Sequence, residues 1–344
     1  MNYRGFVVAA GLLAVFVGVA MTGSTTAQAP EAETDMFVPL QTPWGDPDLQ
    51  GIWSTGYIEV PLERPDEYGS REYLTEENLL GERERLAGQQ DHSTGGEPPT
   101  PAQAGGNVGT YNTAFSGRGR DVIRTRRTSL IIDPPDAKIP WKPGVRDQVA
   151  AEIFTIAGVR GRWRQERLDG PEDRPNDRCR GVVLPHRFGT WEAGGGHLRI
   201  VQTPGAISIY YEYGPHGGAY RTIPLDGRPH LTPGIRQWLG DPIGRWEGDT
   251  LVVDTTNFSN RTNFEGARDQ LHLTERFTRV GPDFIIYDVT VNDPTVFTRD
   301  WTMEIPLTLQ DGRANRIFES ACHEGNYALT SILAGARAEE KAAR

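Results

Sequence analysis

Apolar and polar residues alternate along much of the second half of the chain. Within residues 284–292, Tyr287, Val289 and Val291 fall on one face of an extended strand, whereas Asp288 and Asn292 fall on the other. Comparable stretches, separated by short turns rich in Gly, Pro and Asp, occur at residues 198–203, 207–213, 220–224, 250–257, 271–280, 284–292, 301–307 and 316–322. The pattern therefore predicts antiparallel strands joined by hairpins in a meander.

A sheet of this length, in a chain without the spacing of βαβ units, must bury one of its faces. We therefore expect a mainly β fold in which the antiparallel meander closes into a barrel, with a two-sheet sandwich as the alternative. Helical signals are few, and they predict peripheral helices at residues 75–89, 143–156, 232–239 and 329–343.

The first half of the chain has a different texture. Residues 30–74 are rich in Pro, Gly and aromatic side chains, which indicates an extended segment with one strand, and residues 129–133 form a short strand pattern stopped by two prolines. Residues 92–120 contain seven glycines, three prolines and almost no aliphatic side chain, so we expect a long flexible loop. We divide the chain into an extended region with one helix and this loop (30–125), a barrel-like domain (126–327) and a C-terminal helix (328–344).

The first 29 residues have the pattern of a signal peptide. Arg4 precedes an apolar run over residues 6–21, and small residues then lead to Ala27 and Ala29, the pattern that signal peptidase cleaves after. We expect a periplasmic or extracellular protein with no membrane contact after cleavage. The formal charge of −10 becomes −11 once Arg4 is removed, which argues against nucleic acid as a partner.

The chain has two cysteines, Cys179 and Cys322. In the oxidising compartment that the signal peptide implies, a disulfide between them is the expected state. Neither has the spacing of a redox or haem-binding motif. A nucleophilic Cys322 beside His323 is the alternative.

Four motifs resemble a large family of secreted bacterial proteins that is uncharacterised. They are PLDGRPH at 224–230, GRWEGDTLVVDTTNF at 244–258, LHLTERF at 271–277 and ACHEGNY at 321–327. The resemblance covers most of the chain after the signal peptide, and it implies no activity. The Gly-x-Trp patterns at 51–53 and 244–246 are also similar to the signature of lipocalin-like proteins, which favours a barrel.

The candidate catalytic residues lie on two of the predicted strands. Strand alternation places His272 and Arg276 on one face and Glu275 on the other, and it places Glu319 and His323 on one face of the last strand. If these faces line one cavity, the two histidines serve as base and acid, Glu319 orients an imidazole and Arg276 holds an anionic group. Tyr327 completes this candidate set. The alternative is an ion-pair network that anchors the end of the barrel.

Two further sets concern binding. Tyr211 and Tyr213 share a strand face and can stack on a sugar or an aromatic ring, with Arg221 and Asn257 as polar partners. No cofactor is expected. As an alternative, a divalent metal is held by His230, His272 and His323 with Glu324 or Asp254, although no local spacing typical of a metal site is present.

Three functions remain open from the sequence. The first is a cofactor-independent lyase, hydrolase or isomerase that uses histidine and carboxylate chemistry on a small molecule or oligosaccharide in a barrel cavity. The second is a lipocalin-like or glycan-binding protein without turnover. The third is an envelope protein whose sheet serves for assembly. Convergent histidines and carboxylates favour the first, an apolar cavity favours the second, and the third predicts no cavity.

Overall fold

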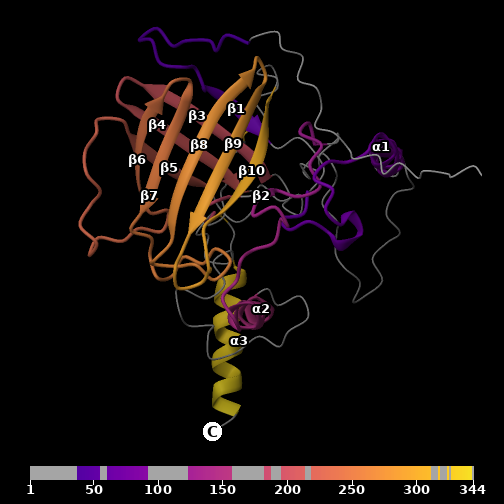
Figure 1. Ribbon diagram of the computed structural model, residues 1–344. Coiled ribbons are helices and arrows are strands. Elements are labelled where there is room, and N and C mark those ends of the chain that lie inside the picture. Colours follow the sequence, from indigo (N-terminus) through magenta and orange to yellow (C-terminus); the bar gives the residue numbers. More distant parts are fainter. Residues whose placement is uncertain are drawn as a thin grey trace, which may run out of the picture.

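The computed structural model describes residues 37–54, 60–91, 123–156, 182–186, 195–213, 218–310, 317, 324 and 327–342. This part of the chain is mainly β, as the alternating pattern predicts, and its antiparallel sheet curls until it is nearly closed into a barrel (Figure 1). The strands are β1 (Gly51–Ser54), β2 (Ile131–Asp133), β3 (Gly195–Thr203), β4 (Ala206–Tyr213), β5 (Ala219–Pro224), β6 (Asp241–Glu247), β7 (Thr250–Thr256), β8 (His272–Gly281), β9 (Phe284–Asn292) and β10 (Trp301–Leu309).

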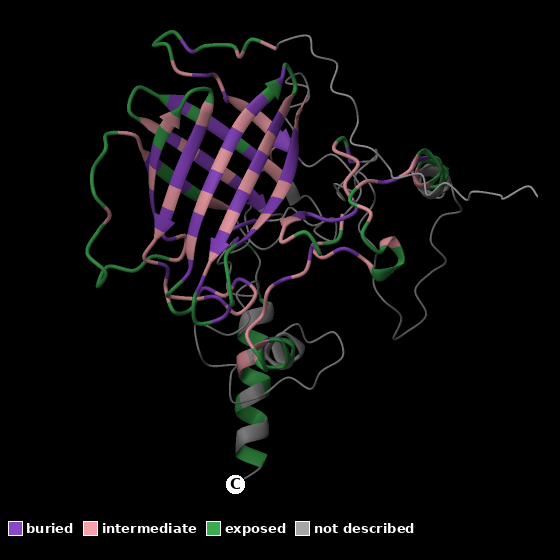
Figure 2. Cartoon of the chain, viewed as in Figure 1, coloured by how far each residue is buried: buried purple, intermediate pink, exposed green. Residues whose placement is uncertain are grey.

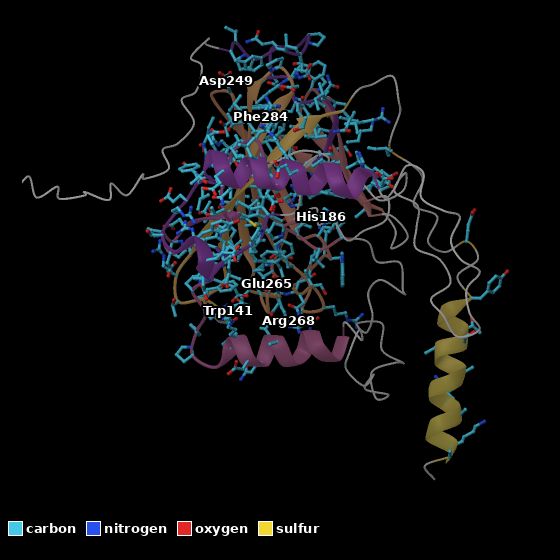
Figure 3. The ribbon with its side chains drawn as sticks, turned by 90° about the vertical axis from the view of Figure 1, so that its right-hand side faces the viewer. Trp141, His186, Asp249, Glu265, Arg268 and Phe284 are labelled. Atoms are coloured by element: carbon cyan, nitrogen blue, oxygen red, sulfur yellow. The ribbon has the colours of Figure 1, made fainter. Side chains whose placement is uncertain are left out.

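The helices lie outside the barrel, as expected. They are the 3-10 turn η1 (Asp66–Tyr68) and the helices α1 (Glu76–Asp91), α2 (Val145–Ile156) and α3 (Ala328–Ala342). The predicted cap of α1 is present, because the Asn78 amide donates to Thr75 Oγ1 at 3.2 Å. Figure 3 shows α2 at the barrel end marked by Glu265 and Arg268, and α3 extending away, and Figure 1 shows α1 standing apart from the barrel. No helix in the described ranges is long and apolar enough to span a membrane.

The predicted helix at 232–239 is wrong. These residues form turns, in which the Gln237 amide donates to the Asn257 carbonyl at 2.9 Å and the Ser259 amide donates to the Gln237 carbonyl at 2.8 Å. These bonds to the residues after β7 replace the bonds that a helix would make within itself. The predicted strand at 316–322 lies almost wholly outside the described residues.

Two hairpin series make up the sheet, and one early strand joins them. The strand order is β5-β4-β3-β1-β10-β9-β8-β7-β6, with β2 paired to β10 beside this path. β1 pairs antiparallel with β3 through Trp53 and Leu198 and with β10 through Trp53 and Leu309. The meander is therefore interrupted between β5 and β6, and the N-terminal strand closes the opposite side.

The odd number of strands along this path explains why β5 and β6 do not form an antiparallel pair. Nine strands lie along the path, and all eight pairings between them are antiparallel. Eight reversals leave β5 and β6 running in the same direction, so an antiparallel ladder cannot join them. They are the two unpaired ends of this nine-strand path, and we call the line between them the seam.

Side chains close one part of the seam. A Cβ at Gly244 of β6 would lie 2.6 Å from Leu225 Cδ2 and 2.7 Å from Ile223 Cγ2, so β6 approaches the end of β5 closely there. Toward the start of both strands, the edges instead border a groove. The barrel is thus packed shut at one part of its seam and open at the other.

The inner face of the barrel is filled with large side chains. Buried and partly exposed residues largely alternate along β8 and β9 (Figure 2). The buried ones include Phe277 and Tyr287, whose rings stack with centroids 4.2 Å apart. The largest fully buried side chains include Trp53, Tyr211, Phe258, Phe277, Tyr287 and Trp301. Because large side chains fill the interior, we expect a ligand site at the seam.

Candidate functional site

The open part of the seam forms a groove of about 650 Å³. One wall is formed by Gly218 and by β5, from Ala219 to Thr222 and at Pro224, and the other is the segment 237–240 with the first two residues of β6. The walls carry Tyr220, Arg221, Gln237, Trp238 and Asp241, a mixture of aromatic, amide and charged groups. The groove has the size of a pocket for a small organic molecule, which typically spans about 300–1,000 Å³.

A buried ion pair lies behind the groove. Arg221 of β5 donates to Glu275 of β8 with two parallel bonds, Nη1 to Oε2 at 2.7 Å and Nη2 to Oε1 at 3.0 Å. Both side chains are buried. Burial opposes the charge on Arg221, yet Glu275 beside it holds the Arg221 pKa above its ordinary value.

Glu275 is held by three strands. Besides the two Arg221 bonds, it accepts a hydrogen bond from the Tyr287 hydroxyl at 2.7 Å and one from the Thr255 hydroxyl at 3.1 Å. Burial, and then the charge of Glu275, raise the pKa of Tyr287 well above its usual range. Tyr211 shares this surrounding, and burial raises its pKa as well. The network fixes Arg221 in one position.

One donor of Arg221 is left over. Its Nε atom is buried and has no hydrogen-bond partner among the described residues, although Arg221 lines the groove. A buried donor without a partner costs about 1–3 kcal/mol. Less than 1 Å² of this atom is accessible, so a ligand in the groove does not reach it unless the side chain moves.

An exposed aromatic ring stands at the edge of the groove. Tyr220 is 75% exposed, and its ring lies against that of Tyr210 on β4, with centroids 4.6 Å apart. Gly218 leaves room for Tyr210, because a Cβ there would lie 2.3 Å from the Tyr210 hydroxyl oxygen. Tyr220 is thus supported from behind while much of its surface faces solvent.

Next to the groove, two histidines meet at one carboxylate. Asp254 Oδ1 lies 2.8 Å from His230 Nε2, and Asp254 Oδ2 lies 2.7 Å from His272 Nε2. The hydrogen bond to Asp254 raises the pKa of His272, and the same bond lowers the pKa of Asp254. We call His230, Asp241, Asp254 and His272 the histidine cluster.

Asp241 connects this cluster to the groove. Its Oδ2 atom lies 3.2 Å from His230 Nδ1 and accepts a hydrogen bond from the Leu231 amide at 2.7 Å. Because Asp241 also belongs to the groove wall, the cluster and the groove share this residue. Three of the four sequence motifs contribute to the cluster, through His230, Asp254 and His272.

The structure does not bring the predicted catalytic residues together in the barrel. His272 and Arg276 lie on the outer face of β8, where Arg276 Nη1 lies 2.9 Å from Glu247, and Glu275 is the residue that points inward. Tyr327 precedes α3 and is 81% exposed. The other two predicted residues, Glu319 and His323, lie outside the described residues.

The predicted binding residues are divided in a similar way. Tyr211 and Arg221 are both buried on the inner face, and Arg221 also lines the groove. Asn257 has φ 55° after β7 and donates to the Leu231 carbonyl at 2.8 Å, so it fixes the turn beside the histidine cluster. Tyr213 ends β4, and its side chain lies outside the described part. Cys179 and Cys322 also lie outside it.

The residues expected as alternative metal ligands come together only in part. His230, His272 and Asp254 do come together, but they are in direct hydrogen-bond contact, and His323 and Glu324 do not join them in the described structure. Within the described ranges, no group of three or more His, Cys, Asp or Glu is arranged to hold a metal ion.

Sequence reasoning missed Glu275 as an interior residue and Tyr220 as a groove residue. A signal for Glu275 was present, because it shares its strand face with Leu273 and Phe277, and apolar neighbours on a face mark it as the buried one. No comparable signal marks Tyr220, because the groove forms where β5 faces residues 237–242, which are separated from β5 in the sequence.

No protein-family model and no curated protein matches the chain. Among solved structures, the chain is similar to secretory abundant heat soluble protein 4 from Ramazzottius varieornatus, at 9% identity and a TM-score of 0.23, over 33% of this chain and 69% of that one. It is similar to a mutant of the fluorescent protein UnaG, at 13% identity and a TM-score of 0.22, over 33% of this chain and 71% of that one. Neither likeness, at these TM-scores, supports a conclusion about this chain.

Proposed function

We propose that this protein binds a small organic molecule in the seam groove, without turnover. The observation that carries the proposal is the groove itself, a concave space of about 650 Å³ between two strand edges that no antiparallel ladder joins. Its lining combines an exposed aromatic ring with a buried arginine whose Nε donor has no partner among the described residues. Binding sites for small molecules commonly combine apolar surface with a few fixed polar groups in this way.

The rigid setting of Arg221 supports the same proposal. A side chain that Glu275 already holds by two hydrogen bonds loses little conformational freedom when a ligand binds. The groove wall at Arg221 is therefore preorganised, and such sites bind more tightly than sites that must first become ordered.

A fragment library screened by saturation-transfer NMR tests this proposal on the full chain. In the variant Thr222→Trp, a bulky side chain from the wall of β5 enters the groove. In the matched control Val201→Trp, the same side chain is placed on the exposed face of β3, away from the groove. We expect fragments that bind the wild type and the control but not Thr222→Trp. If no fragment binds, or if both variants bind alike, the groove is not a ligand site.

Acid–base catalysis is a second candidate, because a carboxylate orients a histidine in the histidine cluster. His272 faces Asp254 through Nε2, and this leaves Nδ1 to exchange a proton with a substrate. In a panel of chromogenic esters and glycosides, we expect an activity that His272→Gln abolishes. The control His197→Gln changes a histidine on β3 and should leave the activity intact. Activity that survives in His272→Gln, or no activity in the wild type, rules this candidate out.

Export and a disulfide between Cys179 and Cys322 belong to the same proposal, supported by the sequence alone. In protein collected from the medium or periplasm, alkylation after denaturation without reductant should modify no thiol, because both cysteines are paired. Two modified cysteines, detected by mass spectrometry, would contradict the disulfide. Intact-mass measurement of the same sample should locate the N-terminus after Ala29.

A further inference from the structure

We infer that the groove ligand is an uncharged sugar ring, an inference that rests on the proposed binding function. The charges around the groove supply the first step. Both Nη atoms of Arg221 are used by Glu275, so the pair carries no net charge toward a ligand. An anionic ligand would gain no unpaired cation there, and it would meet the carboxylate of Asp241 on the opposite wall.

A positively charged ligand is also disfavoured. Asp241 is the acidic side chain of the groove wall, and its Oδ2 atom is already engaged by the Leu231 amide and by His230. The groove therefore fits a ligand without formal charge.

The second step concerns shape and surface. Tyr220 offers the face of an aromatic ring, supported by Tyr210, at the mouth of the groove. A pyranose ring has an apolar face of C–H groups and a rim of hydroxyl groups, so it matches an aromatic face flanked by hydrogen-bonding groups.

The third step concerns those hydrogen-bonding groups. The carboxylate of Asp241 on the groove wall accepts hydrogen bonds, and a sugar hydroxyl donates one. The amide of Gln237 lies exposed on the same wall and both donates and accepts, as hydroxyl groups require. A purely apolar ligand would displace water from Gln237 and Asp241 and leave these groups without a partner.

The test measures binding of cellobiose, maltose and chitobiose to the full chain by saturation-transfer NMR and isothermal calorimetry. We expect at least one of them to bind, and Tyr220→Ala to weaken that binding by about tenfold, because the stacking surface is lost. Tyr220→Phe keeps the ring and should retain most of the affinity. Val201→Ala removes an exposed apolar side chain elsewhere and serves as the control. Cellobiuronic acid, which adds a carboxylate, should bind more weakly than cellobiose.

The outcomes separate this inference from the proposed function. If no neutral sugar binds while Thr222→Trp still blocks other fragments, the groove is a ligand site and the inference is wrong. Equal affinity in Tyr220→Ala and wild type, or tighter binding of the acidic sugar, also overturns it. If Thr222→Trp blocks nothing, the proposed function itself fails.

Discussion

At the scale of single residues, Glu275 holds the inside of the barrel together. It is fully buried and accepts hydrogen bonds from Arg221, Tyr287 and Thr255, each on a different strand. Ion pairs of this kind contribute little relative to apolar packing, but an isolated buried charge is very unfavourable. The network therefore acts as a unit, and its members should not be replaceable one at a time.

Replacing Glu275 by Ala should lower the free energy of unfolding by roughly 3–5 kcal/mol, because Arg221 is left as an unpaired buried charge. The double variant Arg221→Met with Glu275→Leu should recover most of this loss, since it removes both charges. Urea unfolding followed by circular dichroism measures both. A single variant that loses under about 1 kcal/mol would show that the pair is not buried as described.

The pH dependence of stability should report on the histidine cluster. The raised pKa of His272 contributes stability that is fully present below its unfolded value of 6.5 and is lost as the pH rises through the folded value. The lowered pKa of Asp254 contributes stability that is present above 3.8 and is lost as the pH falls through the folded value. Both contributions are therefore present together between these two pH values.

We expect His272→Gln to reduce the loss of stability that the wild type shows as the pH rises above about 6.5. The effect should stay below about 1 kcal/mol, because His272 is 41% exposed and solvent screens the pair. Urea midpoints measured from pH 6.5 upward test it, with Val201→Ala, which changes no titratable group, as the control. Parallel pH profiles for wild type and His272→Gln would show that the pair does not contribute.

Residue identity alone could suggest part of this site. The sequence identified His230, Asp254, His272 and Arg221, because titratable residues within a strongly alternating β region attract attention. Alternation alone does not show which face of a strand is buried. The face of His272 was therefore expected to line the cavity, whereas the buried face is that of Glu275 with Leu273 and Phe277. The Arg221–Glu275 pair joins residues 54 positions apart, and no local pattern encodes such a partner.

At the scale of secondary-structure elements, the close approach of β6 to the end of β5 determines how tightly the seam shuts. Gly244 permits this approach, with Leu225 and Ile223 occupying the space where a side chain would be. The same strand carries Pro242, which cannot donate a ladder hydrogen bond and is tolerated at a sheet edge. Gly244 and Pro242 are therefore compatible with a strand at the edge of a sheet. Because both residues are uncommon inside strands, they also explain why the sequence did not predict a strand at 241–247.

Replacing Gly244 by Ala should destabilise the fold by about 1–3 kcal/mol, because the added methyl group would overlap the side chains of Leu225 and Ile223. The matched control is Gly234→Ala, since a Cβ at Gly234 meets nothing within 4 Å in the described part of the chain. Urea unfolding of the two variants measures the difference. Equal stability would mean that β5 and β6 are farther apart than described.

Elements with local signals were predictable. Hairpin strands and the cap of α1 follow from alternation and from Thr75, and these predictions are confirmed. The helix expected at 232–239 is wrong because bonds to residues 257–259, which are distant in sequence, decide its backbone. Local propensity is a weak guide wherever long-range hydrogen bonds compete with it.

At the scale of the whole molecule, the path contains an odd number of strands, so no antiparallel ladder joins β5 and β6, and the groove lies between them. Insertion of β1 between β3 and β10 brings the path to nine strands and leaves β5 and β6 running in parallel. A meander in the sequence suggests a closed barrel, and only the position of β1 shows that the closure is incomplete. That position depends on pairing across about 250 residues of sequence, for example Trp53 with Leu309, which alternation cannot reveal.

Hydrogen–deuterium exchange of the full chain, with and without the tightest-binding fragment, tests most directly whether the seam groove is the ligand site. We predict slower exchange confined to peptides covering residues 218–224 and 237–242, the two walls of the groove. Thr222→Trp should abolish this protection, and Val201→Trp should preserve it. Protection that appears instead in the strands opposite the seam, or that persists in Thr222→Trp, would contradict the account.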